Sequence, residues 1–271
     1  MDKASVISEQ MKDDLIKKQI AILDSIYEFC DQNNLKISLA YGTLLGAVRH
    51  KGYIPWDHDI DCMMPRKDFD YFCKNFKSDK SYFLQTNSTD SNFKWSFAKV
   101  RDTNTTFIEP FNLDKQMNQG IWVDIFPYDK ASNNSFLSWI QYKCVVLKIK
   151  FMNPLNVKSK SRKLLESIFG HRTLLNFLIK LSVNCGKNSN YIADFSANLE
   201  TSKIKMKDVF DDFTVIEFEG KQYRCISDYD YYLTMNYGNY MVIPSNQSLD
   251  NELTLLSKCI IDPYKSYKEY L

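Results

Sequence analysis

Three aspartates close together near residue 60 indicate metal-dependent chemistry. Asp57, Asp59 and Asp61 occur at alternate positions. Side chains two residues apart in a strand share a face, so Asp59 and Asp61 are expected to project together from a strand over 59–64. Two neighbouring carboxylates repel each other unless a cation lies between them. The pattern therefore predicts a Mg²⁺ or Mn²⁺ site in which substrate phosphates supply further ligands.

An EF-hand calcium loop is an alternative use of the same aspartates. Such a loop needs a glycine at its sixth position, where this chain has Cys62, and Pro65 stands at its ninth. The EF-hand is thereby excluded. An Asp-x-Asp pair also occurs on solvated strand ends, so the residues around it must decide whether it binds metal.

Gly42 and Thr43 lie between a strand-like segment at 36–41 and a short helical segment at 44–49. Glycine allows a ligand to approach the backbone, Thr43 offers a hydroxyl, and the free N–H groups of a helix start favour an anion. An ordinary strand-to-helix connection has the same pattern. The order strand, Gly-Thr, helix, Asp-x-Asp is nevertheless typical of the nucleotidyltransferase superfamily.

The stretch from Tyr41 to Asp61, with the Met-Pro-Arg-Lys-Asp-Phe segment that follows it, resembles the LicD family. This family includes bacterial phosphocholine transferases and the related fukutin-type sugar-alcohol phosphate transferases. Further matching fragments lie at 98–102, 123–129 and 237–241. The family usually has aspartate where this chain has His58. Because His58 is expected to point away from the face of the Asp-x-Asp pair, we expect the metal site to be retained.

Asp124 is the third carboxylate candidate. It stands in the otherwise apolar run 121–126, where a lone aspartate is costly to bury without a cation or hydrogen-bond donors. Capping or a salt bridge is the alternative. The resemblance implies that Asp124 is a metal ligand or the general base.

Four basic residues are candidates for substrate binding. Lys99 and Arg101 share a strand face and are expected to neutralise charge on a pyrophosphate as it becomes the leaving group, with solvated edge charges as the alternative. Arg49 and His50 end the Gly-Thr helix. For these two, a ligand contact and simple complementation of the helix dipole both stay open.

Composition excludes several protein classes. The chain has 271 residues and a net charge of +2, which argues against a dedicated nucleic-acid binder. Its seven cysteines include no C-x-x-C pair and are expected to be reduced core residues. No signal-peptide or transmembrane pattern is visible, so a cytoplasmic location is expected.

Hydrophobic periodicity predicts an α/β (α+β) fold with a mixed sheet, flanking helices and a helical C-terminal portion. The resemblance implies that this sheet is nucleotidyltransferase-like. We expect a catalytic core at 1–130 and, at 131–271, a helical and hairpin portion that completes the acceptor side and packs with the core as one unit. The expected elements are helices at 11–30, 67–76 and from 228 to about Gly238, strands at 36–41, 59–64, 82–86, 95–101, 105–109 and 120–126, and a hairpin at 213–226.

The segment from Lys143 to Lys187 holds ten Lys and Arg residues against the single acid Glu166, with apolar residues interleaved. A basic amphipathic helical pair of this kind can lie on an anionic membrane. The alternative is a pair of helices that cover the sheet with lysines pointing to water. The docking hypothesis singles out four basic residues: Lys158, Lys160, Arg162 and Lys163.

The resemblance implies metal-dependent transfer of a phospho-alcohol, most simply phosphocholine from CDP-choline with release of CMP. The expected acceptor is a hydroxyl of a cell-surface glycan precursor such as teichoic acid, capsule or lipopolysaccharide, lipid-linked or free, and contact with the inner membrane surface is a further expectation. Two alternatives stay open. The same site could attach a nucleotide from a nucleoside triphosphate, or the chain could be a non-catalytic binding relative.

Overall fold

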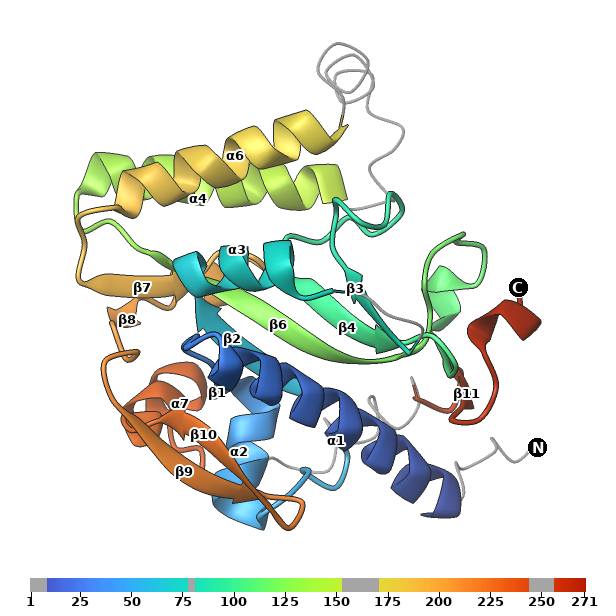
Figure 1. Ribbon diagram of the computed structural model, residues 1–271. Coiled ribbons are helices and arrows are strands. Elements are labelled where there is room, and N and C mark those ends of the chain that lie inside the picture. Colours follow the sequence, from blue (N-terminus) through green and yellow to red (C-terminus); the bar gives the residue numbers. More distant parts are fainter. Residues whose placement is uncertain (1–8, 78–80, 153–170, 244–255) are drawn as a thin grey trace.

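A seven-stranded mixed sheet organises the protein. The computed structural model describes residues 9–77, 81–152, 171–243 and 256–271 (Figure 1). Five strands follow the order β1-β2-β6-β4-β3, and β7 and β8 extend the sheet from β6. Their bounds are β1 (Ser38–Leu39), β2 (Asp61–Pro65), β3 (Tyr82–Gln85), β4 (Ala98–Asp102), β6 (Ile121–Lys130), β7 (Tyr191–Asp194) and β8 (Met206–Lys207).

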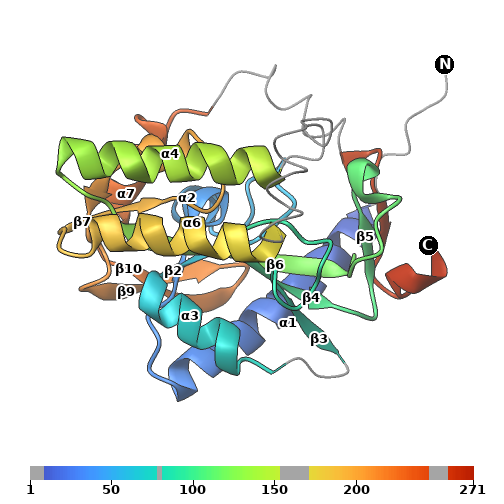
Figure 2. The same ribbon diagram turned by 90° about the horizontal axis from the view of Figure 1, so that it is seen from above.

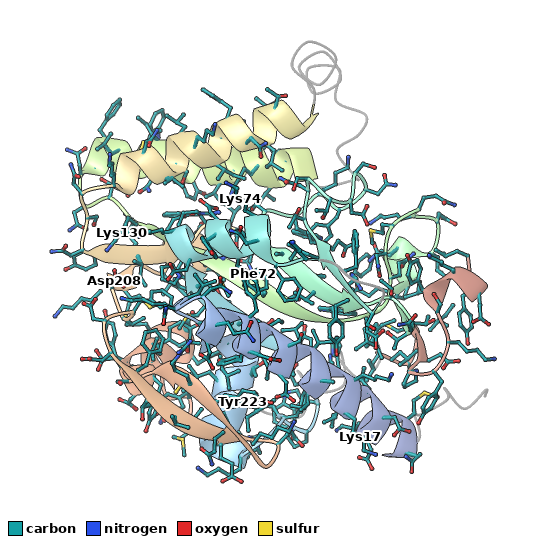
Figure 3. All side chains as sticks on the ribbon, viewed as in Figure 1. Lys17, Phe72, Lys74, Lys130, Asp208 and Tyr223 are labelled. Atoms are coloured by element: carbon teal, nitrogen blue, oxygen red, sulfur yellow. The ribbon has the colours of Figure 1, made fainter. Side chains whose placement is uncertain are left out.

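The central strand β6 brings the predicted site residues together. It pairs in parallel with β2, so that Asp124 lies opposite Asp61, and antiparallel with β4, so that Asp124 also lies opposite Lys99. At its other end β6 pairs with β7, and the Lys130 Nζ atom forms a 2.6 Å ion pair with Asp208, just after β8 (Figure 3). The sheet thus contains strands from both of the expected portions, 1–130 and 131–271. The division of the chain into these two portions stays a prediction.

Helices pack against the sheet and form an outer layer. The 24-residue α1 lies along the sheet and packs against β6 and β4, while α4 and α6 lie side by side in an outer layer (Figures 1 and 2). The bounds are α1 (Glu9–Gln32), α2 (Tyr41–His50), α3 (Arg66–Asn75), α4 (Ser135–Met152), α6 (His171–Gly186) and α7 (Tyr229–Tyr237), with short 3-10 turns η1 (Pro110–Asn112), η3 (Thr201–Lys203) and η4 (Tyr267–Glu269).

Two small sheets complete the fold. β9 (Phe213–Phe218) and β10 (Lys221–Ile226) form the predicted hairpin, whose turn residues Glu219 and Gly220 have φ angles of 51° and 71°. The Glu-Gly sequence suits this turn because glycine adopts positive φ without a steric penalty. β11 (Ile260–Asp262) pairs with β5 (Thr106–Ile108).

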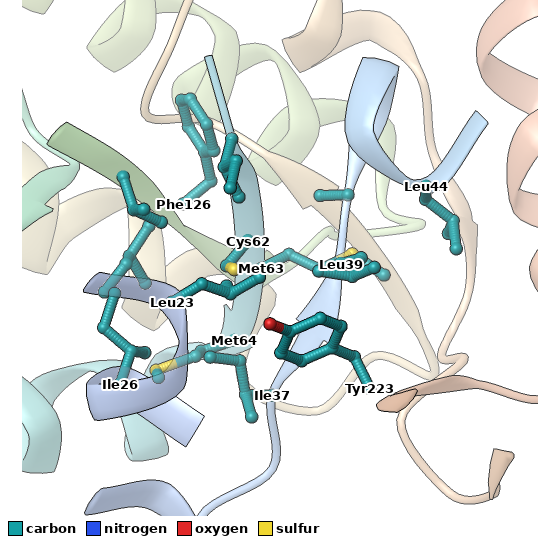
Figure 4. Packing of buried hydrophobic residues seen from close by; sticks show 14 of the residues in the cluster. Leu23, Ile26, Ile37, Leu39, Leu44, Cys62, Met63, Met64, Phe126 and Tyr223 are labelled. Atoms are coloured by element: carbon teal, nitrogen blue, oxygen red, sulfur yellow. The ribbon is translucent and has the colours of Figure 1, made fainter. Parts of the chain in front are cut away.

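The hydrophobic core lies between the sheet, α1 and α2. In Figure 4, side chains from α1, β1, β2, α2 and the hairpin converge: Leu23, Ile26, Leu39, Leu44, Cys62, Met63, Met64 and Tyr223. Cys62 and Met64 are buried in β2, but Met63 between them is buried as well, so both faces of this strand are covered and burial does not alternate along it. Close packing in the core therefore fixes the position of β2, the strand that begins at Asp61.

The predicted α+β class is confirmed, but several element boundaries differ. β2 begins at Asp61 rather than at the expected residue 59. The strand expected at 36–41 is only Ser38–Leu39, because Tyr41 turns into α2 with a φ of 42°. β4 starts three residues later than expected, at Ala98. β6 continues past Pro127 to Lys130, although proline lacks an N–H for the ladder.

A candidate metal and phosphate site

Asp59, Asp61 and Asp124 converge at one point of the sheet. One carboxylate oxygen from each lies within 4.8 Å of the other two. Asp61 opens β2 and Asp59 precedes it, while the Asp124 N–H donates to the carbonyl of Ile60 over 2.8 Å. The parallel pairing of β2 with β6 thus brings together carboxylates that are more than sixty residues apart in sequence.

Burial and neighbouring negative charge make Asp61 and Asp124 hard to ionise in the absence of a cation. Burial raises the pKa of Asp61 well above its usual value, and the charges of Asp59 and Asp124 raise it further. Burial also raises the pKa of Asp124 to about 6, although the Lys99 ammonium opposes that shift. A bound divalent cation would favour the ionised forms, since opposite charge stabilises carboxylates.

The contacts of Asp124 leave one of its oxygens available. Its Oδ2 atom accepts hydrogen bonds from Lys99 Nζ at 2.8 Å and from Trp122 Nε1 at 3.0 Å. Lys99 Nζ is also 2.8 Å from Oδ1, but not in hydrogen-bonding geometry, and the buried Oδ1 accepts no hydrogen bond. The salt-bridged role left open by the sequence is therefore realised, and Oδ1 still fits a metal ligand. Three hard oxygen donors suit Mg²⁺ or Mn²⁺.

Gly42 and Thr43 lie in the first turn of α2 rather than in a loop before it. The Thr43 Oγ1 atom accepts a 2.8 Å hydrogen bond from the backbone N–H of Asp61, so this hydroxyl fixes the start of β2. Ala40 occupies the N-cap position and offers no side-chain cap. A phosphate group at this end of α2 would meet N–H groups and the positive end of the helix dipole.

Gly42 leaves room for a close approach of Asp57. A Cβ atom at position 42 would lie 2.4 Å from the Asp57 Oδ2 atom. The carboxylate of Asp57 is thus held against the first turn of α2, where the helix dipole favours a negative charge. Its charge also contributes to the raised pKa of Asp61. A fourth aspartate therefore borders the cluster.

Lys99 and Arg101 share a strand face as predicted, but only Lys99 reaches the carboxylates. Lys99 Nζ lies 4.1 Å from the centroid of the Trp122 ring, against Asp124. Arg101 is only 2% exposed and donates to the Gln85 side chain at 2.5 Å and the Gly120 carbonyl at 2.6 Å. The guanidinium of Arg101 therefore holds protein groups together, and its role toward substrate stays a prediction.

Arg49 and His50 lie at the far end of α2 from Thr43. Six residues of helix separate Thr43 from Arg49, or about 9 Å along the axis. The Arg49 Nη1 atom donates to the carbonyl of Tyr240 at 2.9 Å, which ties α2 to the segment after α7. Burial, and then the charge of Arg49, lowers the pKa of His50. Their roles toward a ligand also stay predictions.

His58 stands apart from the carboxylate cluster. Its ring stacks on Phe107 with a centroid distance of 5.8 Å, and its backbone carbonyl accepts a 2.9 Å hydrogen bond from Gln19 of α1. Gln19 is fully buried, and its Oε1 atom accepts a hydrogen bond from the Tyr53 hydroxyl. Gln19 thus positions the aspartate loop from a distant helix, which no local sequence signal indicated.

A buried tyrosine cluster anchors the start of α2. The Tyr41 hydroxyl donates to Asp194 Oδ2 at 2.7 Å, and the hydroxyls of Tyr128 and Tyr232 lie 3.1 Å apart. Tyr232 also accepts a hydrogen bond from the backbone N–H of Tyr41 at 3.2 Å. Burial raises the pKa of Asp194. These contacts come from β6, β7 and α7, so only the tertiary fold reveals them.

A family model and several known proteins are similar in sequence to this chain. Residues 34–159 match the family model described as LicD/FKTN/FKRP, nucleotidyltransferase domain. The chain is 28% identical to the lipopolysaccharide cholinephosphotransferase LicD of Haemophilus influenzae over 243 residues, which cover 83% of this chain and 89% of that protein. An uncharacterized protein of Rickettsia typhi is 41% identical over 51 residues, which cover 19% of this chain and 16% of that protein. An uncharacterized protein of Rickettsia prowazekii is 43% identical over 47 residues, which cover 17% of this chain and 18% of that protein. The resemblance to the LicD family that the sequence indicated is thereby confirmed over residues 34–159.

Proposed function

We propose that this protein transfers phosphocholine from CDP-choline to a hydroxyl of lipopolysaccharide or a related cell-surface glycan, in a reaction that needs Mg²⁺ or Mn²⁺. The observation that carries the proposal is the convergence of Asp59, Asp61 and Asp124 within 4.8 Å of one another. The similarity to a lipopolysaccharide cholinephosphotransferase supports the choice of group and acceptor.

In this reaction the acceptor hydroxyl oxygen attacks the choline-bearing phosphorus. The bond from that phosphorus to the oxygen of CMP breaks, and CMP departs with the electron pair while the hydroxyl loses its proton. A divalent cation held by the three aspartates would offset negative charge on the pyrophosphate. The remaining work falls to side chains of the chain itself.

Each of these side chains has a defined task under the proposal. Thr43 fixes the backbone of Asp61. The Tyr41 N–H is taken by the Tyr232 hydroxyl, and the N–H groups that follow it in the first turn of α2 would face a phosphate. Lys99 supplies positive charge beside Asp124 for the departing CMP. Asp124, with a pKa of about 6, is able at neutral pH either to hold the cation or to take the acceptor proton.

The test is to identify the product released from a panel of donors. The purified protein is incubated in Mg²⁺ with CDP-choline, CDP-ethanolamine or a nucleoside triphosphate, together with a lipopolysaccharide acceptor. Release of CMP from CDP-choline that stops on adding EDTA, or in Asp59→Asn, supports the proposal. Asp211→Asn, which changes an exposed aspartate outside the cluster, serves as the matched control.

Two other outcomes would favour the alternatives. Release of pyrophosphate from a nucleoside triphosphate would indicate nucleotide transfer, which the description of the matching domain as a nucleotidyltransferase favours as second candidate. Failure of the whole panel, with donor binding retained, would indicate a non-catalytic binding relative.

A further inference from the structure

The outer face of α4 and α6 exposes an unusual number of large apolar side chains. Phe136, Trp139 and Leu147 on α4 are 67%, 55% and 42% exposed, and Phe177 on α6 is 59% exposed. Single exposed apolar residues are ordinary, but a group of them on one layer marks an interaction surface. We call these four residues and the exposed Lys143, Lys150 and Lys180 the outer face.

The outer face follows directly from helix geometry. Steps of three and four residues place Phe136, Trp139, Lys143, Leu147 and Lys150 on one side of α4. The Phe136 and Trp139 rings stack at a centroid distance of 6.2 Å, and Lys143 Nζ lies 5.5 Å from the centroid of the Trp139 ring. Aromatic and cationic groups are thus interleaved. Side chains of the pair project away from the sheet (Figure 3).

The opposite side of α4 is packed against the rest of the protein. Cys144 and Val145 are buried there, and the buried Lys148 donates to Ser96 Oγ and to the carbonyl of Phe195. Residue 96 is next to Phe97, whose ring centroid lies 5.5 Å from Lys99 Nζ. The helix that carries most of the outer face is therefore joined to the segment that leads into β4, the strand that carries Lys99.

The positive charge of the outer face favours an anionic partner. Neither α4 nor α6 contains an acidic residue, and the outer face has three lysines. Contact with a second copy through the same face would bring lysines against lysines. Exposed aromatics mixed with lysines are instead typical of helices that lie in the interface of an anionic bilayer.

We propose that the outer face of α4 and α6 docks the protein on an anionic lipid surface. Within the described part of the chain, none of the helices has the length and apolar character needed to cross a bilayer, so this contact is peripheral. Lys158, Lys160, Arg162 and Lys163, the residues favoured from the sequence, lie outside the described residues. The proposal goes beyond the transfer reaction, and its test needs no catalytic activity.

The test measures co-sedimentation of the full chain with phosphatidylglycerol-containing vesicles and with pure phosphatidylcholine vesicles. Preferential binding to the anionic vesicles that weakens in high salt is expected. Combined Lys143→Glu, Lys150→Glu and Lys180→Glu should weaken binding at least about a hundredfold, since the loss of each lysine near such a surface costs about fivefold and the new glutamates are repelled by it. Combined Trp139→Ser and Phe177→Ser should weaken it about tenfold or more.

A matched control carries the same charge change elsewhere. Lys207, Lys258 and Lys268 are exposed and lie outside α4 and α6, so reversal of these three charges should alter binding far less. Unchanged thermal melting of every variant would show that the fold is retained. Absence of binding, or equal loss in the control, would overturn the proposal. A concentration-dependent dimer that disappears in the Trp139→Ser, Phe177→Ser variant would assign the face to self-association instead.

Discussion

The carboxylate site and the outer face break the rule of polar outside and apolar inside in opposite directions. At the site, Asp124 is only 5% exposed within an apolar strand; on the outer face, Phe136 is 67% exposed to solvent. Both arrangements are unfavourable for an isolated chain. The comparison teaches that one proposal accounts for both regions: each is built to meet something the protein binds, a cation in the first region and an apolar, anionic surface in the second.

Replacing one aspartate should have the largest effect on the first region. Asp61→Asn should reduce phosphocholine transfer about a thousandfold, because charge on the transferred group is no longer offset. The melting temperature in EDTA should rise, since a buried, mutually repelling charge is removed. Turnover and thermal melting are measured side by side. Loss of activity together with a fall in melting temperature would point to a purely structural aspartate.

Lys148 sharpens the comparison, because it is a buried cation on the inner side of the helix that carries the outer face. Burial lowers the pKa of Lys148 to about 8 from an ordinary 10.5. The unfolded chain therefore binds more protons between these two values, and the stability of the folded protein gains as pH rises through that window.

Comparison with Lys148→Met isolates this contribution. The stability of the wild type relative to the variant should be constant below about pH 8 and should increase by up to about 3 kcal/mol toward pH 10.5. Urea unfolding at several pH values provides the measurement. If the difference in unfolding free energy between the wild type and the variant did not change with pH, burial would not lower the pKa of Lys148.

Thr43 should link stability to function within the carboxylate site. Thr43→Val removes the acceptor of the Asp61 N–H and leaves a polar group unsatisfied, at a cost of about 1–3 kcal/mol. Activity should fall as well, because the start of β2 is no longer fixed. Thr43→Ser, which keeps the hydroxyl, should recover both the unfolding free energy and kcat. If Thr43→Val matched the wild type in both, the hydroxyl would have no positioning role.

Gly42→Ala should have the smallest effect on stability and a specific effect on the site. Alanine is favoured over glycine in a helix by about 1 kcal/mol, but its Cβ would displace the Asp57 carboxylate. We expect melting close to that of the wild type with a higher KM for CDP-choline. The double variant Gly42→Ala, Asp57→Ala removes the clash and separates it from loss of the carboxylate. An unchanged KM in Gly42→Ala would show that the position of Asp57 does not matter.

Local patterns predicted the parts of the fold that depend on period and turn chemistry. The three-and-four spacing of apolar residues predicted α1, and the Glu-Gly turn predicted the hairpin of β9 and β10. Alternation around Asp59 and Asp61 predicted that they share a strand face; the structure brings their carboxylates together, although Asp59 lies just before β2. These features are encoded within a few consecutive residues.

Contacts between distant segments were beyond the reach of those patterns. The parallel pairing that sets Asp124 beside Asp61, the support from Gln19 and the anchoring of Tyr41 by Asp194 each join separate elements. The turn into α2 was placed too late because Tyr41 adopts a positive φ that is uncommon for a residue other than glycine. The basic residues of 143–187 were expected to face solvent or a membrane, yet the ammonium of Lys148 is buried and donates to the carbonyl of Phe195.

Binding of Mn²⁺ to the purified protein tests the central claim most directly, because it requires neither donor nor acceptor. Calorimetric titration at neutral pH should show binding by the wild type and by Asp211→Asn, and none by Asp59→Asn or Asp61→Asn. Affinity should fall as pH decreases through about 6, where Asp124 becomes protonated and no longer offers a charged oxygen. Absence of binding by the wild type, or equal affinity in Asp61→Asn, would contradict the assignment of a metal site to these three aspartates.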